Sequence, residues 1–104
     1  GVSRDKIAEA LRAEGLSVSN RYANLHLLPT YQLKQAYGSN GFPWSSEICK
    51  RVVDYSKGIC PVAENLNDKK YLGLGLCNYA LKDNDINLIL ETFHKVFENL
   101  AELR

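Results

Sequence analysis

The sequence lacks both a long apolar run and an excess of charge of one sign. No hydrophobic run approaches the ~20 residues that span a bilayer, and residues 1–5 lack the apolar region of a signal peptide. The net charge is +1, with lysine and arginine scattered among aspartate and glutamate. Without a basic stripe to meet phosphates, neither nucleic acid nor an anionic membrane is an expected partner. These absences favour a cytoplasmic protein.

Cysteine is also scarce. The chain has three cysteines, at Cys49, Cys60 and Cys77. They lie too far apart for a metal knuckle, and an odd number cannot close into a disulfide framework. We therefore expect reduced, structural thiols and no metal site. The alternative is a nucleophilic cysteine assisted by His26 or His94, for which the sequence contains no supporting motif.

Motifs for nucleotide binding and hydrolysis are missing as well. Gly73 and Gly75 could suggest a dinucleotide loop, but the third glycine and the helix that should follow are absent. The sequence has no Walker motif, no Gly-x-Ser-x-Gly elbow and no paired histidines at helix spacing. The residues by themselves therefore indicate a small domain without naming its chemistry.

The composition is that of a globular protein. Of the 104 residues, 45% are hydrophobic and 24% are charged. A chain of this length forms one domain as a rule and buries roughly two thirds of its unfolded surface. We therefore expect a single domain over residues 1–104.

The clearest local pattern is an amphipathic helix over residues 83–103. Its apolar side chains recur at three- and four-residue spacing and form one stripe: Ile86, Ile89, Leu90, Phe93, Val96, Phe97 and Leu100. Asp83 is the expected N-cap, and Asp85 places a negative charge in the first turn, where the helix dipole favours it. Such a stripe needs a partner surface.

The first half of the chain predicts two further helices and a strand. A helix over residues 4–14 is capped by Ser3 and ended by Gly15. Residues 16–22 alternate between apolar and polar, which is typical of a strand with one face covered. Residues 31–37 can form two more helical turns.

The second half predicts two more helices and a second strand. Ser45 or Ser46 could cap a helix that ends at Gly58, and Pro61 suits the first position of a short helix over residues 61–67. Residues 71–76 carry leucine on one face and glycine on the other, and glycine in a strand usually marks close approach by another backbone.

Together these elements predict a two-layer α+β (α/β) fold. In it, the helices that start at Arg4 and Asp83 pack on one face of a small sheet built from the two strands.

Four runs of the sequence, in register, resemble a known enzyme family. They are GVSRDKIAEALRAEGL at residues 1–16, YANLHLLPTY at 22–31, CPVAE at 60–64, and Asp85-Ile86 leading to Phe93-His94-Lys95-Val96. In this order they look like the C-terminal small domain of the DegT/StrS-type sugar aminotransferases. The resemblance covers nearly the whole chain.

The resemblance implies a fold and a chemistry. Family members are homodimeric, pyridoxal-phosphate enzymes of the aspartate aminotransferase fold (fold type I). They transfer an amino group from a donor such as glutamate to a keto-sugar, typically nucleotide-linked, or to a related cyclic ketone. The lysine, phosphate-binding segment and acidic residue that hold the cofactor lie in the large domain. This chain would then be a C-terminal fragment with no catalytic or cofactor-binding residue of its own. The alternative is a stand-alone binding or interaction module with the same small fold.

Three residues are carried over as candidate substrate contacts. Tyr22 and His26 match positions that face the active site in similar proteins, and Arg21 could bind a phosphate or carboxylate. The alternatives are that His26 bonds to a backbone carbonyl, that Tyr22 packs at a rim, and that Arg21 is simply exposed. His94 is expected to be solvated surface, and Pro61 and Glu64 are expected to be structural.

The chain also departs from the family pattern. Gly75 replaces a proline that the family often has in a Leu-Pro-Leu run, and residues 38–57 are longer than the usual connection. In the family, a strand precedes the first helix. Without that strand, we expect an exposed sheet edge or an apolar strip.

Overall fold

The computed structural model describes all residues from 1 to 104. It contains four α-helices and one two-stranded antiparallel sheet, so the predicted mixture of helices and a small sheet is confirmed. The chain divides into two compact units: unit 1 comprises residues 1–22 and 68–104, and unit 2 comprises residues 23–67. The single domain expected over residues 1–104 stays a prediction.

Helix α1 (Arg4–Ala13) of unit 1 begins where the sequence predicts and ends one residue earlier than predicted, with Glu14 as its C-cap. The Ser3 side chain accepts a hydrogen bond from the Lys6 N–H at 3.3 Å, and Asp5 lies in the first turn. Gly15 has a φ of +95°, the left-handed conformation that glycine adopts without strain after a helix. Local sequence therefore determines both ends of this helix.

Helix α4 (Asp83–Glu98) is shorter than predicted, and its cap differs. The N-cap is Lys82, whose N–H donates to the Asp85 carboxylate at 2.9 Å, so Asp83 is the first helical residue. At the other end, the Asn99 side-chain amide donates to the Lys95 carbonyl at 2.7 Å. This bond occupies an oxygen that the next helical N–H would have used, and the chain continues as a 3₁₀ turn, η4 (Leu100–Leu103).

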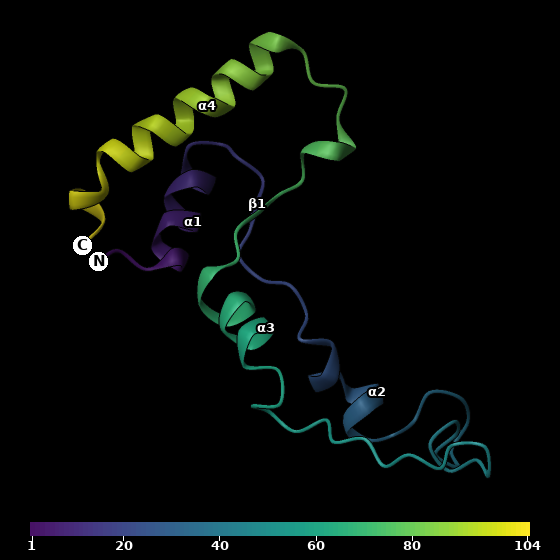
Figure 1. Ribbon diagram of the computed structural model, residues 1–104. Helices are drawn as coiled ribbons and strands as arrows, with labels where there is room; N and C mark the ends of the chain where they lie inside the picture. Colours follow the sequence, from purple (N-terminus) through teal and green to yellow (C-terminus); the bar gives the residue numbers. More distant parts are fainter. The chain divides into compact units, whose positions relative to one another are not determined.

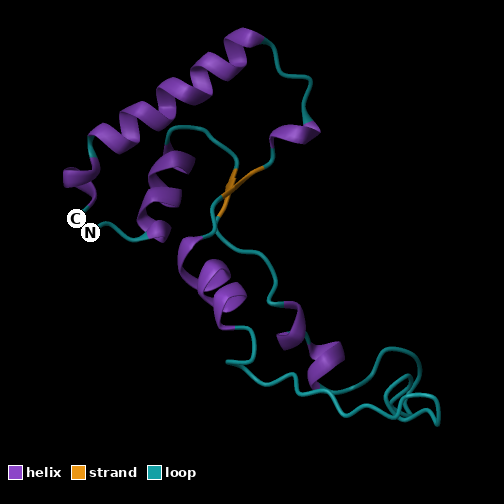
Figure 2. Ribbon diagram, viewed as in Figure 1, coloured by secondary structure: helices purple, strands orange, loops and turns teal.

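The sheet of unit 1 is much smaller than predicted. Strands β1 (Val18–Ser19) and β2 (Gly73–Leu74) pair Val18 with Leu74 and Ser19 with Gly73 (Figure 2). The prediction of strands over 16–22 and 71–76 was therefore wrong in length. The Ser19 hydroxyl donates to the Arg21 carbonyl at 2.9 Å, a local bond that competes with the ladder. The close neighbour on the side-chain position of Gly73 is a ring: a Cβ there would lie 2.8 Å from Cζ of Tyr71.

The core of unit 1 lies where α1, α4 and the sheet meet. It consists of Ala8, Leu11, Val18 and Val96, surrounded by half-buried side chains from the same elements. Figure 1 shows α1 and α4 side by side, with both chain termini at the same end. The two helices and the sheet thus share one core, while the predicted two-layer packing of both helices on one face of the sheet stays a prediction.

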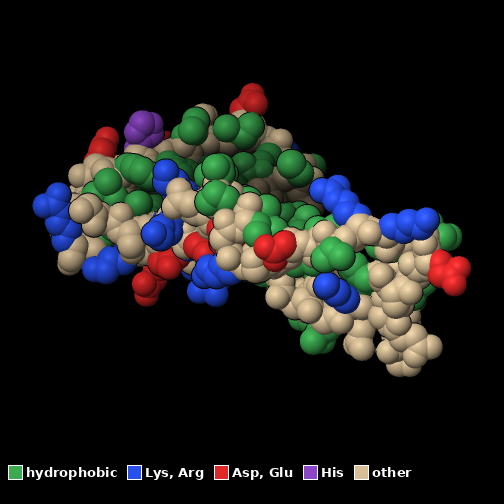
Figure 3. Space-filling model, turned by 60° about the horizontal axis from the view of Figure 1, so that its bottom comes forward, with side chains coloured by type: hydrophobic (Ala, Val, Ile, Leu, Met, Phe, Trp, Pro, Cys, Tyr) green, Lys and Arg blue, Asp and Glu red, His purple; other side chains and the backbone are tan.

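Much of the apolar stripe of α4 is uncovered. Val96 is buried, but Ile86, Leu90 and Phe97 are between 44% and 52% exposed. Phe93 and Phe97 stack on each other with ring centroids 6.1 Å apart. Figure 3 shows hydrophobic side chains lying next to one another at the protein surface. Helix α4 therefore carries an exposed apolar strip, while the edge or strip expected from the missing strand of the sheet stays a prediction.

Unit 2 contains short helices and long connections. Its elements are η1 (Leu25–Leu27), α2 (Pro29–Gln32), α3 (Pro61–Asn65) and the start of the π-helical turn η2 (Leu66–Lys70). The helix predicted over 31–37 lies earlier, at α2, and Tyr37 instead forms a β-bridge with Phe42. The short helix predicted over 61–67 is confirmed as α3, two residues shorter.

The helix predicted from Ser45 or Ser46 to Gly58 does not form. The Ser45 and Ser46 hydroxyls bond backwards, to the carbonyls of Asn40 (2.6 Å) and Pro43 (2.8 Å), and so cap no helix. Two of the apolar positions that suggested the helix have no partner surface, since Ile48 is 93% and Val52 is 90% exposed. An amphipathic helix without a surface to cover is marginal in water.

Candidate functional site

The most tightly organised polar cluster is in unit 2, around the Glu64 carboxylate. Glu64 lies on α3 and is the one buried charged residue, at 7% exposure. Its Oε1 atom accepts hydrogen bonds from the Gly58 N–H at 2.8 Å and the Cys60 N–H at 3.3 Å. The same oxygen lies 2.9 Å from Nε2 of His26, which is on η1. One carboxylate oxygen thus joins three segments of unit 2.

Local sequence explains this arrangement. Pro61 occupies the first helical position of α3, where its missing N–H costs nothing. Glu64, one turn later, reaches back to the N–H of the capping residue Cys60, much as in a capping box. Gly58 supplies a φ of +102°, which turns its N–H toward the carboxylate. Pro61 and Glu64 therefore have the structural roles that the sequence suggested.

The hydrogen bonds to Glu64 settle the protonation of the cluster. The Gly58 N–H contributes most to holding the pKa of the Glu64 carboxyl below its usual range, and His26 and the Cys60 N–H add to this against the effect of burial. Glu64 is therefore ionised at neutral pH and can only accept. It follows that Nε2 of His26 carries the proton, and Nδ1 is the ring nitrogen left for any other partner.

The lowered pKa of Glu64 predicts an acid-sensitive unit 2. A carboxyl whose pKa is lower in the folded than in the unfolded state stabilises the fold above its unfolded pKa, and this contribution is lost as the pH falls through the folded pKa. We expect Glu64→Gln to lower the thermal midpoint at pH 7. The difference from the unchanged protein should shrink below about pH 4. Thermal unfolding from pH 7 to pH 3 measures this.

The matched control for this prediction is Glu91→Gln, at an exposed position on α4. It removes the same charge without touching the cluster, and its midpoint should follow that of the unchanged protein at every pH. A constant gap between Glu64→Gln and the unchanged protein down to pH 3 would contradict the proposed linkage.

The three sequence-predicted contacts fall in different units. His26 lies in unit 2, and its side chain is 11% exposed. Its ring bonds to the Glu64 carboxylate, and not to a backbone carbonyl as the alternative proposed. Arg21 and Tyr22 lie in unit 1, and both are exposed. The Tyr22 ring packs at 6.1 Å from that of Tyr71, as the packing alternative proposed. Their roles toward a substrate stay predictions.

Next to this cluster, unit 2 contains three packed aromatic rings that sequence reasoning missed. Tyr31 lies 5.2 Å from Tyr55 and 6.0 Å from Trp44, measured between ring centroids. The Trp44 indole N–H donates to the Tyr55 hydroxyl at 3.1 Å. The Gln32 amide donates to the carbonyls of both His26 and Tyr55 at 2.7 Å and so ties the rings to the histidine loop. The sequence feature that could have revealed this cluster is the density of aromatic residues between positions 31 and 55.

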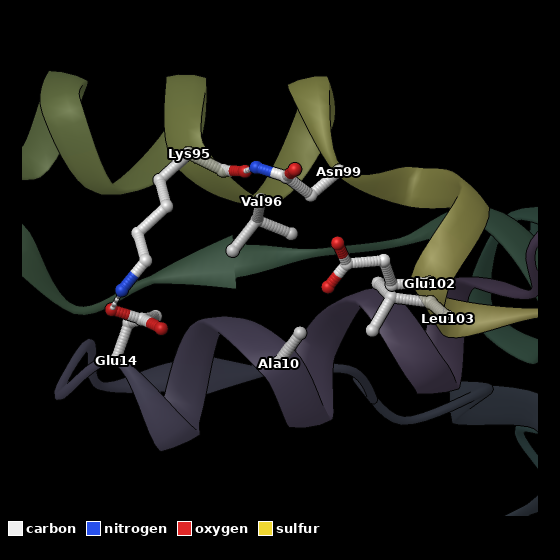
Figure 4. A pocket seen from close by; sticks show the side chains of 7 residues that line it. All are labelled: Ala10, Glu14, Lys95, Val96, Asn99, Glu102 and Leu103. Atoms are coloured by element: carbon white, nitrogen blue, oxygen red, sulfur yellow. Dashed lines mark hydrogen bonds and ion pairs between the residues drawn. The ribbon is translucent and has the colours of Figure 1, made fainter.

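A small pocket of about 150 Å³ lies between α1 and α4 in unit 1. Figure 4 shows Lys95 reaching from α4 to Glu14 at the end of α1, with Nζ and Oε2 2.6 Å apart. Val96 and Ala10 form its apolar side. Because Lys95 and Glu14 pair across this pocket, it helps to join the two helices.

The other candidate chemistries find little support. His94 is exposed, as predicted. All three cysteines are free, but Cys49 and Cys77 are exposed, so the expected packing role is wrong for these two. No group of three or more histidine, cysteine, aspartate or glutamate side chains is arranged to hold a metal ion. None of the helices has the length and hydrophobicity that crossing a bilayer requires.

Comparison with known proteins finds no matching family model, no matching curated protein and no matching solved structure.

Proposed function

We propose that this chain is the C-terminal small domain of a pyridoxal-phosphate-dependent sugar aminotransferase. In the complete enzyme the amino group would pass from a donor such as glutamate to the cofactor, and then to a keto-sugar or related cyclic ketone. The observation that carries the proposal is the set of four sequence runs, in register, that resemble this family.

Two features of the structure support the proposal. The runs coincide with ordered elements of the fold: α1, the turn η1 that carries His26, the start of α3, and α4. The exposed apolar strip of α4, with Leu90 at 52% and Phe97 at 49%, is a surface that a large domain of the same enzyme would cover. Contiguous apolar surface of this kind on a soluble protein commonly marks an interface.

This chain offers no site for the cofactor itself. A lysine that forms a Schiff base is generally desolvated in a pocket, which favours its neutral, nucleophilic form. Every lysine of this chain is exposed. Under the proposal the cofactor belongs to the large domain, so we assign it no contact here and derive no step through it.

The second candidate function is a binding module without chemistry of its own. One observation favours it: unit 2 has an aromatic-lined cavity of about 450 Å³ that needs no second domain to form. The two candidates differ in what precedes this chain in its reading frame. A segment of about 250 residues with the cofactor lysine would support the aminotransferase, given the usual domain sizes.

Cofactor trapping tests the proposed function directly. We expect the 104-residue chain, mixed with pyridoxal phosphate and reduced with borohydride, to retain no stoichiometric label. The protein that includes the preceding segment should retain one cofactor on a lysine outside residues 1–104, and should aminate a nucleotide-linked keto-sugar with glutamate as donor. Peptide mass mapping locates the label. Stoichiometric labelling of any lysine within residues 1–104 would contradict the proposal.

A further inference from the structure

Residues 49–56 form an extended segment of unit 2 that has the features of an unpaired β-strand. The segment contains no helix and no turn, and it leads toward α3 (Figure 1). From Val52 to Ser56 its side chains alternate between exposed and half-buried, the pattern of a strand with one covered face. Val53 and Tyr55 are the half-buried residues, and Val52 is 90% exposed. No neighbouring strand accompanies this pattern.

One edge of this segment is free. In an extended chain the backbone groups of successive residues point alternately to the two edges. The Tyr55 carbonyl accepts a hydrogen bond from the Gln32 amide at 2.7 Å, so its edge is turned toward α2. On the opposite edge, the N–H and carbonyl of Val52, the N–H of Asp54 and the carbonyl of Lys50 have no hydrogen-bond partner in the protein. Such a row of backbone groups is a template for another strand.

The sequence of the segment is complementary to itself. Two antiparallel strands related by a two-fold axis place one residue opposite its own copy. With Val52 on the axis, Lys50 of each copy lies opposite Asp54 of the other, on the exposed face. Opposite charges that face each other across a strand pair stabilise it, and like charges destabilise it. The free backbone groups of the two copies then form a ladder, and no hydrogen bond within either chain is broken.

The Asp54 carboxylate is ionised and can accept a further hydrogen bond. It accepts from the Ser56 N–H at 2.8 Å and from the Ser56 hydroxyl at 3.0 Å. The N–H is the main cause that holds the pKa of the Asp54 carboxyl below its usual range, the hydroxyl adds to this effect, and the charge of Lys34 contributes least. A carboxylate has about four acceptor positions. The bonds to Ser56 therefore leave room for an ammonium group from a second copy.

The neighbouring register is less suited to pairing. With Val53 on the axis, Val52 would lie opposite Asp54 of the second copy, so the carboxylate would meet no positive charge. This register would also use the edge on which the Tyr55 carbonyl is already bonded. We propose that residues 50–54 pair with the same residues of a second copy of this chain, antiparallel and with Val52 on the two-fold axis.

The proposed contact is independent of the proposed function. Residues 38–57 are the connection that is longer than in the resembled family, so the family pattern does not supply this strand. Under the proposed function the large domain lies outside residues 1–104, so a dimer of this chain alone must come from its own surface. Failure of the cofactor-trapping test leaves strand pairing intact, and a monomeric chain leaves the trapping test unaffected.

Sedimentation equilibrium of the 104-residue chain tests the proposal. A short strand pair is a small interface, so we expect a reversible dimer with a Kd on the order of 0.1 mM. Val52→Pro removes the N–H at the axis and should raise this Kd roughly tenfold or more, as expected for loss of the hydrogen bonds there. The fold should not change, because Val52 is 90% exposed and its N–H is unbonded. Circular dichroism checks the fold.

Charge reversal tests the register. Lys50→Glu and Asp54→Lys each place like charges opposite each other in a homodimer, so each should raise the Kd roughly tenfold. A mixture of the two variants restores opposite charges at both positions and should form a heterodimer about as tight as the unchanged homodimer. Arg51→Glu is the matched control, since it makes the same change of charge opposite Val53 of the second copy. It should alter the Kd by less than about threefold.

Several results would overturn the proposal. They are a chain that stays monomeric up to about 1 mM, a dimer that survives Val52→Pro, equal effects of Lys50→Glu and Arg51→Glu, and a mixture that fails to restore pairing. The exposed strip of α4 is the competing surface, and Leu90→Lys reports on it. A dimer that is lost in Leu90→Lys and kept in Val52→Pro would assign the interface to α4.

Discussion

Leu11→Ala is expected to destabilise the fold by about 2–5 kcal/mol, the usual cost of removing a large side chain from a packed core. Leu11 on α1 is fully buried, and it belongs to the cluster that joins α1 to Val18 on β1 and Val96 on α4. Since only four hydrophobic residues of the chain are buried, few neighbours can close around the cavity left behind. Chemical denaturation followed by far-UV circular dichroism measures the change.

Leu88→Ala on α4 is the control for this prediction, because it removes the same atoms from a side chain that is 55% exposed. It should change the free energy of unfolding by no more than about 0.5 kcal/mol, as is usual for surface sites. A difference between the two variants of less than about 1 kcal/mol would mean that Leu11 does not anchor the core.

The predictions that succeeded depend on neighbours in the sequence. The start of α1 follows from Ser3 and Asp5, and its end follows from Gly15, because capping bonds and the left-handed conformation involve residues within one turn. Proline at the first position placed α3 in the same way. The pattern of α4 was recognisable because its apolar period extends over four turns.

The predictions that failed depended on surfaces elsewhere in the fold. The helix expected before Gly58 had an apolar period, but its residues Ile48 and Val52 are 93% and 90% exposed. The strands were predicted too long, because the alternation of apolar and polar residues in one strand does not show where its partner strand ends. Only Val18 and Ser19 find pairing partners, at Leu74 and Gly73.

The candidate site was predictable in part. The sequence singled out His26 and assigned a structural role to Glu64, but it could not bring the two together, because they are 38 residues apart in the chain. The aromatic cluster escaped notice for the same reason: Tyr31, Trp44 and Tyr55 lie on segments with no common period. Contacts between irregular segments leave little trace in periodicity.

His26→Gln is expected to lower kcat/KM for the acceptor roughly ten- to over a hundredfold in the complete enzyme, with little change in stability. The figure corresponds to about 1.5–3 kcal/mol, typical of a hydrogen bond with charged character, which the Glu64 carboxylate behind the ring provides. The glutamine amide can replace Nε2 toward Glu64, so the link between η1 and α3 survives. It cannot replace Nδ1, the atom left for an acceptor hydroxyl.

His26→Asn makes the opposite change and serves as the matched variant. Its amide lies near the position of Nδ1 but does not reach Glu64, so it should lower the unfolding midpoint while retaining more of the activity than His26→Gln. Acceptor kinetics and thermal unfolding, measured side by side, separate the two roles of the ring. If His26→Gln stays within about twofold of the unchanged enzyme while His26→Asn unfolds earlier, the imidazole serves only to hold η1 on α3. In that case the Glu64 contact at 2.9 Å is its whole function.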